Sequence, residues 1–254
     1  MFNKISRQFT ILILVLSSMN GCATMGQNPD DPFEEFNRGV FTLNKDLDAM
    51  VMKPIAEVYQ TVTPEPVNQG VSNFFSNLDD IMVIANDLLQ FKFEQAASDS
   101  GRFLVNSTIG LLGFVDFATD LGLPKHNEDF GQTLGYWGIE SSPYLVLPFL
   151  GPSTVRDVAG RGVDIWLNPM IYVDNNDVSL GINAIKFTDL RADLMAAEQI
   201  LDAAALDPYT FMRDAYLQRR NYLVHDGNPP QNQEGVDELF DDLFDDAETS
   251  VEKP

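Results

Sequence analysis

Cys22 is the only cysteine of the 254-residue chain, and its surroundings predict that it carries lipid. Two basic residues precede an apolar stretch at residues 9–16, and a glycine stands directly before the thiol. A stretch of about 8 apolar residues is too short to cross a bilayer, which takes about 20. We therefore interpret residues 1–21 as a bacterial lipoprotein signal, Cys22 as the lipidated first residue of the mature chain, and residues 22–30 as a linker. The alternative is an ordinary secretory signal followed by a free thiol.

The two histidines, His126 and His225, stand in no spacing that binds zinc or activates a nucleophile. The sequence contains no GxSxG, P-loop, GxGxxG, HExxH or CxxC motif. Residues 174–177 resemble the start of a calcium loop, but Val178 occupies a ligand position and no glycine follows, which favours a polar turn. We therefore expect no enzyme activity, no cofactor and no metal. A hydrolase built from scattered Asp, Ser and His side chains stays an alternative.

The chain carries 38 acidic and 16 basic side chains, which gives a formal net charge of -22. Nucleic acid and anionic lipid headgroups repel such a protein, so neither is expected as an electrostatic partner. Attachment to a membrane then has to come from the acyl anchor and from apolar surface. The acidity suits a soluble periplasmic partner with a basic face.

Apolar residues recur at helical spacing along most of the chain, which predicts an all-α fold. The first helix is expected to run from Asp31 as N-cap and Pro32 at the first helical position to Pro54, where the pattern stops. Further helices are expected over 67–78, from Asn77 or Asp79 to Leu89, from Phe93 toward Ala118 with a bend at Gly110 and Gly113, after Ser153 as a cap, over 190–201, and from Asp207–Pro208 to the basic pair Arg219–Arg220.

Residues 129–152 are rich in glycine, proline and aromatic side chains, and we expect an irregular hairpin loop there instead of a helix. Two uncharged stretches, residues 103–115 and 141–155, are either core or lipid-facing surface.

The C-terminal segment is strongly acidic, because residues 226–254 contain ten acids and one lysine. One interpretation is a solvated, disordered tail. The other is a short amphipathic helix that folds on a partner, with an apolar contact face made of Val236, Leu239, Phe240, Leu243 and Phe244.

Four segments of the chain resemble signatures of the VacJ/MlaA outer-membrane lipoproteins, in the same order and with similar spacing. They are DPFEEFNRGVF (31–41), FGQTLGYWG (130–138), PYLVLPFLGPSTVRD (143–157) and DPYTFMRDAYLQRRNYL (207–223). The resemblance implies one helical domain over residues 31–227, ring-like with a central amphipathic channel, and an acidic tail over 228–254. The family often has glycine where this chain has Ser141–Ser142, which predicts a stiffer hairpin.

The resemblance also implies a function. The protein would lie in the inner leaflet of the outer membrane, on its periplasmic side, and would bind trimeric porins. It would take mislocalised phospholipid from the outer leaflet through its channel and pass it to a soluble periplasmic lipid carrier. The sequence leaves open the direction of transport, the headgroup preference, the porin and the helices that line the channel.

A channel for phospholipid needs a polar wall for the headgroup beside apolar surface for the acyl chains. On the first helix, Asn37, Arg38 and Asn44 are candidates for the polar wall, and an ordinary solvated face is the alternative. The glycine-rich segment adds four candidates for the lipid path, namely Gly135, Trp137, Gly138 and Tyr144. Two other functions stay open, a non-transporting envelope scaffold and a periplasmic lipid hydrolase.

Overall fold

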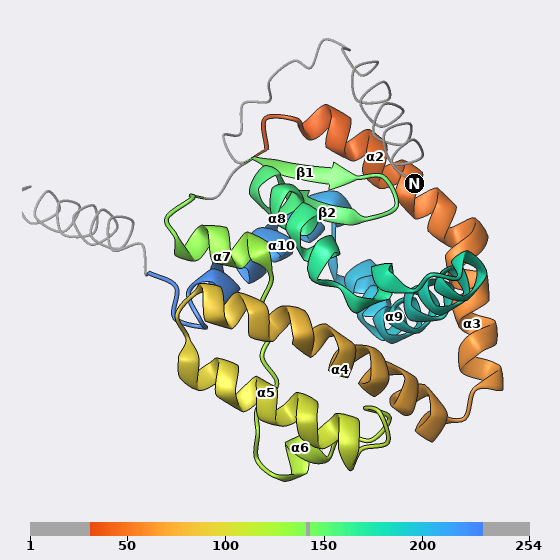
Figure 1. The fold of residues 1–254 in the computed structure, drawn as a ribbon. Coiled ribbons are helices and arrows are strands. Elements are labelled where there is room, and N and C mark those ends of the chain that lie inside the picture. The colour runs from red at the N-terminus through yellow and green to blue at the C-terminus, as the bar shows by residue number, and fades with distance from the viewer. Residues whose placement is uncertain (1–30, 141–142, 231–254) are drawn as a thin grey trace, which may run out of the picture.

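The computed structural model describes residues 31–140 and 143–230, apart from the side chains of residues 199–204. The helices α2, α3, α4 and α7 and the β1–β2 hairpin follow one another around a ring, and α8, α9 and α10 lie within it (Figure 1). The predicted all-α, ring-like fold is therefore confirmed, whereas the central channel stays a prediction. The elements are α2 (Glu34–Leu47), the π-helix η1 (Asp48–Met52), α3 (Lys53–Val62), α4 (Glu65–Leu89), α5 (Phe93–Thr108), α6 (Phe117–Asp120), α7 (Phe130–Tyr136), β1 (Tyr144–Leu147), β2 (Gly151–Thr154), α8 (Val155–Leu167), the 3-10 helix η2 (Pro169–Tyr172), α9 (Asn176–Ala204) and α10 (Pro208–Val224).

The first helix does not end at Pro54, so that prediction is wrong. The chain passes from α2 through η1 into α3, and Pro54 stands in the first turn of α3. Proline lacks an N–H and clashes with the carbonyl four residues earlier in a regular α-helix. The π turn widens the helix before Pro54, where the N–H of Lys53 bonds to the carbonyl of Asp48, and this carries the helix past the proline.

Asp31 is not the N-cap of α2, which begins after Phe33 without a side-chain cap. The carboxylate of Asp31 is fully buried instead and accepts hydrogen bonds from Asn37 Nδ2 at 2.8 Å and from the hydroxyl of Tyr209. These contacts join the start of the described chain to α10.

The two helices expected on either side of Asn77 and Asp79 are one helix, α4. Neither residue caps a helix, because both side chains bind other elements. Asn77 donates to Ser107 Oγ on α5 at 2.9 Å, and Asp79 forms an ion pair with Lys186 on α9 at 2.6 Å.

The helix expected from Phe93 toward Ala118 ends at Thr108 as α5, and the short α6 follows after a bend. The predicted bend is confirmed: Gly113 has a φ of +95°, which favours glycine. A Cβ atom at Gly113 would also lie 2.7 Å from the Cβ of Asn77, so α4 leaves no room for a side chain.

The glycine-rich segment begins with a helix, so the expectation of a loop is wrong for residues 130–136. Asp129 caps α7 by accepting from the N–H of Gln132 at 2.9 Å. The predicted hairpin follows, with Tyr144 opposite Thr154 and Leu147 opposite Gly151.

The predicted caps of α8 and α10 have different outcomes. The cap of α8 is Thr154, whose hydroxyl accepts from the N–H of Asp157, so the prediction of Ser153 is wrong. Asp207 caps α10 and Pro208 stands at its first turn, as predicted.

Two asparagines of α2 hold the hairpin by its main chain. Asn37 donates to the carbonyl of Tyr144 at 3.0 Å and accepts from the N–H of Val146 at 2.9 Å. Asn44 repeats the pattern, donating to Leu147 at 2.9 Å and accepting from Phe149 at 2.8 Å. Asn37 and Asn44 are seven residues apart, which is a rise of about 10.5 Å along a helix. Tyr144 and Leu147 are three residues apart, which is about 10 Å along a strand. The spacing of the two side chains along α2 therefore matches the spacing of the main-chain groups that they bind, one pair in β1 and one pair that extends into the turn after it.

A buried pair of carboxyl groups lies between α4 and α5. Asp87 and Asp99 are both fully buried, and Asp99 also contacts His126 Nδ1 at 2.9 Å. Burial, together with the hydrogen bond to Asp99 and the nearby negative charges of Asp99 and Glu128, raises the pKa of Asp87 from 3.8 to about 8. Among the described residues no donor faces Asp87 Oδ2. A proton held by Asp87 and donated to Asp99 satisfies both acids.

Replacing Asn37 with alanine should loosen the hairpin. The N–H of Val146 and the carbonyl of Tyr144 would lose this partner in the interior, and each buried unsatisfied group costs about 1–3 kcal/mol. We expect the Tm in a thermal melt to fall by at least about 4 °C. Asn73→Ala is the control on α4, because that side chain makes a single 3.3 Å hydrogen bond to Phe114. Equal melting of the two variants would contradict the proposed support of the hairpin.

The pKa of Asp87 predicts how stability changes with pH. The folded protein holds this proton more tightly than the unfolded chain, so its stabilising effect is full below pH 3.8 and is lost as the pH rises to about 8. In Asp87→Asn the side-chain amide can still donate to Asp99, and this contribution to the pH dependence disappears. Thermal melts between pH 5 and 9 should show wild-type stability declining relative to that of Asp87→Asn. Asp120→Asn, at an exposed end of α6, should follow the wild type. Parallel curves for wild type and Asp87→Asn would refute the shared proton.

Candidate functional site

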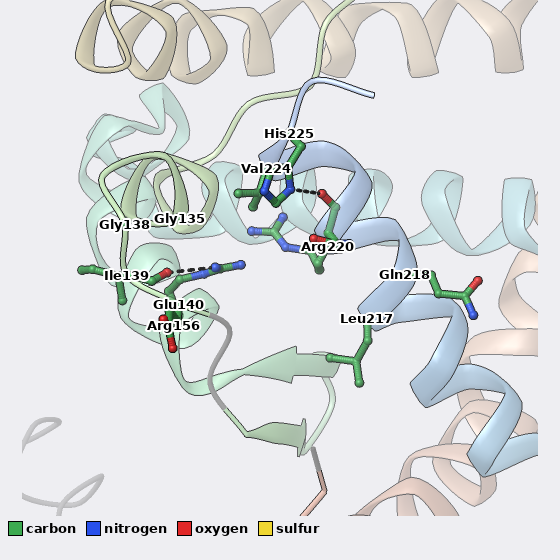
Figure 2. Close-up of a pocket in the computed structure, with 11 residues that line it drawn as sticks. Gly135, Gly138, Ile139, Glu140, Arg156, Leu217, Gln218, Arg220, Val224 and His225 are labelled. Carbon is green, nitrogen blue, oxygen red and sulfur yellow. Dashed lines mark hydrogen bonds between the residues drawn. The ribbon is translucent and has the colours of Figure 1, made fainter. Parts of the chain in front are cut away.

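A pocket of about 550 Å³ opens between α7, the segment after it, the start of α8 and the last turns of α10 (Figure 2). Its volume lies within the range of about 300–1,000 Å³ that is typical of small-molecule sites. The lining combines two arginines, one glutamate, a histidine, and apolar and uncharged polar residues, and it consists of Gly135, Gly138, Ile139, Glu140, Arg156, Leu217, Gln218, Arg220, Asn221, Val224 and His225.

An ion cluster around Arg220 forms the inner wall of this pocket. The guanidinium donates to Asp129 Oδ2 at 2.5 Å and Asp129 Oδ1 at 2.9 Å, and to Asp157 Oδ1 at 2.7 Å. The hydroxyl of Tyr216 donates to the other oxygen of Asp157 at 2.7 Å. Arg220 is therefore held in buried ion pairs and does not stand in the last turn of α10.

The cluster shifts the pKa of Arg220 and the pKa of Asp129 in the directions that keep both groups charged. Burial alone would lower the pKa of Arg220, but hydrogen bonds and charge from Asp129 and the charge of Asp157 raise it. Burial alone would raise the pKa of Asp129, but Arg220 and the N–H of Gln132 lower it. Burial and the Asp157 carboxylate raise the pKa of Tyr216, which therefore stays a hydrogen-bond donor.

Two glycines bring α7 close enough to α8 to place both carboxylates on Arg220. A Cβ atom at Gly160 would lie 2.3 Å from the nitrogen of Gly131, and one at Gly131 would lie 2.5 Å from Asp157 Oδ1. Any side chain at either position would force the helices apart.

Of the four residues predicted along the lipid path, the structure brings two to this pocket. Gly135 and Gly138 line it, and a Cβ atom at Gly135 would lie 2.8 Å from Val224 Cγ1. Trp137 is half exposed and donates to the carbonyl of Leu89 at 3.2 Å, beside α4. Tyr144 is fully buried, and its ring packs against the rings of Tyr209 and Tyr216.

The three candidates for a polar wall on α2 contact the hairpin and α10. Asn37 and Asn44 hold the hairpin. Arg38 forms an ion pair with Asp207 at 2.7 Å and lies 4.3 Å above the ring of Tyr209. Contact of these residues with a headgroup stays a prediction.

Arg156, Arg220 and the two aspartates that bind Arg220 were not among the site residues predicted from the sequence. One signal was present: the uncharged stretch 141–155 ends abruptly at Arg156–Asp157. A charged pair that follows such a stretch is a candidate for burial with a partner.

The described residues show an unusual division between interior and surface. They bury 19 polar or charged side chains but only 11 hydrophobic ones, while many large apolar side chains are exposed. Exposed apolar residues gather at the α5–α6 corner, where Ile109, Leu111, Leu112, Phe114, Val115 and Leu121 lie, and along α9, with Val178, Leu180, Ile185, Phe187, Leu190 and Leu194. Phe149 at the tip of the hairpin is 80% exposed. Where exposed apolar side chains form a contiguous patch, they mark contact with lipid or with another protein.

Two further findings concern the described residues alone. None of their helices combines the length and the apolar character that crossing a bilayer requires. They also contain no cluster of three or more His, Cys, Asp or Glu side chains placed to hold a metal ion.

Comparison with known proteins identifies relatives over almost the whole chain. The model of the MlaA lipoprotein family matches residues 29–223. The intermembrane phospholipid transport system lipoprotein MlaA of Shigella flexneri is 33% identical over 247 residues, which cover 94% of this chain and 97% of that protein. The protein of the same name from Escherichia coli K12 is 32% identical with the same coverage. An uncharacterised protein of Rickettsia conorii is 34% identical over 209 residues, 82% of each chain.

The fold is also found among solved structures. A chain from work described as "Structural basis for maintenance of bacterial outer membrane lipid asymmetry" superposes with a TM-score of 0.67 and 32% sequence identity, covering 76% of this chain and 98% of that chain. The family model, the relatives and the superposed structure agree with the resemblance seen in the four segments. The chain belongs to the MlaA lipoprotein family.

Proposed function

We propose that this protein is a lipid-anchored outer-membrane protein that removes mislocalised phospholipid from the outer leaflet and passes it to a soluble periplasmic carrier. The observation that carries the proposal is the exposed apolar surface around a polar interior. Exposure of this apolar surface to water costs free energy, whereas contact with acyl chains does not. The names of the relatives, as phospholipid transport lipoproteins, support the same assignment.

The route of the lipid is part of the proposal. The central amphipathic channel would run inside the ring, and Gly135, Trp137, Gly138 and Tyr144 would lie along or beside the path. The pocket at α10 supplies both surfaces that a phospholipid needs, with apolar side chains next to polar ones. No covalent bond changes in such a transfer, so the function needs no cofactor.

Two protein partners complete the proposal. Trimeric porins would hold the protein in the outer membrane, and the periplasmic carrier would receive the lipid. Leu239, Phe240, Leu243 and Phe244 of the acidic tail are the proposed contacts for the carrier. These residues and Cys22 lie outside the described part of the chain.

A scaffold without transport activity is the alternative function, and bound lipid distinguishes the two. The full-length protein purified in detergent should carry phospholipid, detected by mass spectrometry of the extracted lipids. A washed preparation free of phospholipid would favour the scaffold. Release of fatty acid from phospholipid by the pure protein would instead indicate a hydrolase.

Replacing Cys22 with alanine should abolish lipidation and release the protein from the outer membrane. Two acyl signals suffice for stable anchoring, and a lipoprotein N-terminus carries more than that. Membrane fractionation and intact-mass measurement test this expectation, with Cys22→Ser as a second thiol-free variant. An alanine variant that is still processed and acylated would show that the anchor is wrongly assigned.

Deleting residues 233–254 should weaken binding of the carrier while folding and anchoring stay unchanged. The ten acids of residues 226–254 would speed the encounter with a basic carrier, most strongly at low salt. Pull-downs of the carrier with full-length and truncated protein, at low and moderate salt, provide the measurement. If both forms bind equally, the segment is a solvated tail without this role.

A further inference from the structure

Large apolar side chains gather where α4 and α7 end. The six that define this aromatic corner are all exposed: Leu88, Leu89, Phe91, Phe93, Tyr136 and Trp137. The indole N–H of Trp137 donates to the carbonyl of Leu89 at 3.2 Å, and Lys92 Nζ lies 5.9 Å from the centre of the Tyr136 ring. The rings of Phe91 and Phe93 stand edge to face, with their centres 6.3 Å apart. These contacts bring the ends of α4 and α7 and the start of α5 next to one another.

The backbone of Phe91 is strained although its side chain is not buried. Its φ of +61° lies in the left-handed region, which favours glycine. Main-chain hydrogen bonds fix this turn, from the N–H of Phe91 to the carbonyl of Leu88 at 3.2 Å and from the N–H of Lys92 to the carbonyl of Asp87 at 2.9 Å. Packing does not offset the strain, because the Phe91 ring is 67% exposed and the Phe93 ring beside it is 64% exposed. Strained residues cluster at functional sites, so Phe91 indicates contact with another molecule.

The acidic tail begins at the same corner. The ammonium of Lys92, in the α4–α5 turn, forms ion pairs with Glu128 at 2.9 Å and with Asp226. The N–H of Gly227 donates to the carbonyl of Tyr222 at 2.9 Å, which holds the chain where α10 ends. The ends of α4 and α10 therefore lie side by side (Figure 1). A partner that binds the tail is brought close to the aromatic corner.

Acids border the aromatic corner and favour a water-soluble protein over a membrane as its partner. Glu94 and Glu140 are exposed beside it in the sequence, and Asp226 is exposed where it binds Lys92. Moving carboxylates into hydrocarbon is very unfavourable. An apolar and aromatic centre with a polar rim is typical of protein–protein interfaces.

We propose that the aromatic corner is a docking surface for the soluble periplasmic lipid carrier, which contacts the corner and the acidic tail together. The inference rests on the proposed function and adds a contact surface on the folded domain to it. The carrier that fits has an apolar patch bordered by basic side chains, since acids border the corner. Because the tail begins at the corner, contact with one raises the effective concentration of the carrier at the other.

Phe91→Gly is the test, because it removes the ring at a position where glycine relieves the backbone strain. The affinity of the full-length protein for purified, phospholipid-loaded carrier is measured by biolayer interferometry. We expect about tenfold weaker binding or more, as for an aromatic residue at the centre of an interface. The Tm should not fall, since no buried contact is lost.

Phe149→Gly is the matched control. Phe149 has nearly the same backbone conformation, with a φ of +64°, and is also strongly exposed, but it lies at the tip of the hairpin beside α2. This variant should bind the carrier as the wild type does. A second control tests for a membrane contact by flotation with vesicles of phosphatidylethanolamine and phosphatidylglycerol. In the Cys22→Ala background, Phe91→Gly should float to the same extent as its parent.

Each contrary result has a definite meaning. Equal carrier affinity of the wild type and Phe91→Gly would overturn the docking surface and leave the hand-off to the carrier standing. Equal losses in Phe91→Gly and Phe149→Gly, or reduced flotation of Phe91→Gly, would also overturn it. If Phe91→Gly lowers the Tm, Phe93→Ser decides: weaker carrier binding supports the corner, and unchanged binding overturns it. A wild type that binds no carrier would remove the hand-off together with the docking surface.

Discussion

The guanidinium of Arg220, held between Asp129 and Asp157, is the contact on which the architecture around α10 depends. Both aspartates also take part in a helix cap: the carboxylate of Asp129 caps α7, and the backbone N–H of Asp157 donates to the Thr154 hydroxyl that caps α8. The same ion cluster therefore fixes where two helices begin and how α10 lies across them. Removing one partner of such a buried pair costs about 3–5 kcal/mol, since the remaining charge stays buried. The pocket is a consequence of this arrangement, because its inner wall is the cluster itself.

A polar interior is the counterpart of an apolar exterior. When large apolar side chains face outward, packing of the core supplies less of the stability and less of the geometric specificity. Here hydrogen bonds and ion pairs supply the stability and the geometric specificity. The asparagine pairs between α2 and the hairpin, and the contacts of Asp31 and Arg38 with α10, hold elements at fixed distances without a large apolar core. The buried core cluster is accordingly small, with Val40, Tyr144, Val146 and Tyr209 as its members.

The sequence predicted the helical class, the start of α10 and the bend at Gly113, because each of these depends on local signals. The Asp207–Pro208 pair begins α10, although the same pair at Asp31–Pro32 does not begin α2, and Gly113 adopts the positive φ that glycine permits. The errors arose where a tertiary partner overrode the local signal. Asn77 and Asp79 are residue types that often cap helices, but here their side chains bind α5 and α9. The helix continues through Pro54 by way of a π turn, which no residue pattern predicts. The pocket could not be predicted for a similar reason, because Arg156 and Arg220 come together only where α7, α8 and α10 pack against one another.

The long contacts of the N-terminal segment bear on how the chain folds as it is made. Asp31 binds Tyr209 across 178 residues of sequence, Arg38 binds Asp207 across 169, and Asn37 binds Tyr144 across 107. Contacts so distant in sequence form slowly, because a long stretch of chain must be ordered before they close. A chain that emerges with its N-terminus first cannot complete the ring until the last helix has been released. During that interval α2 lacks its partners and apolar side chains are exposed, which makes the growing polypeptide prone to aggregation.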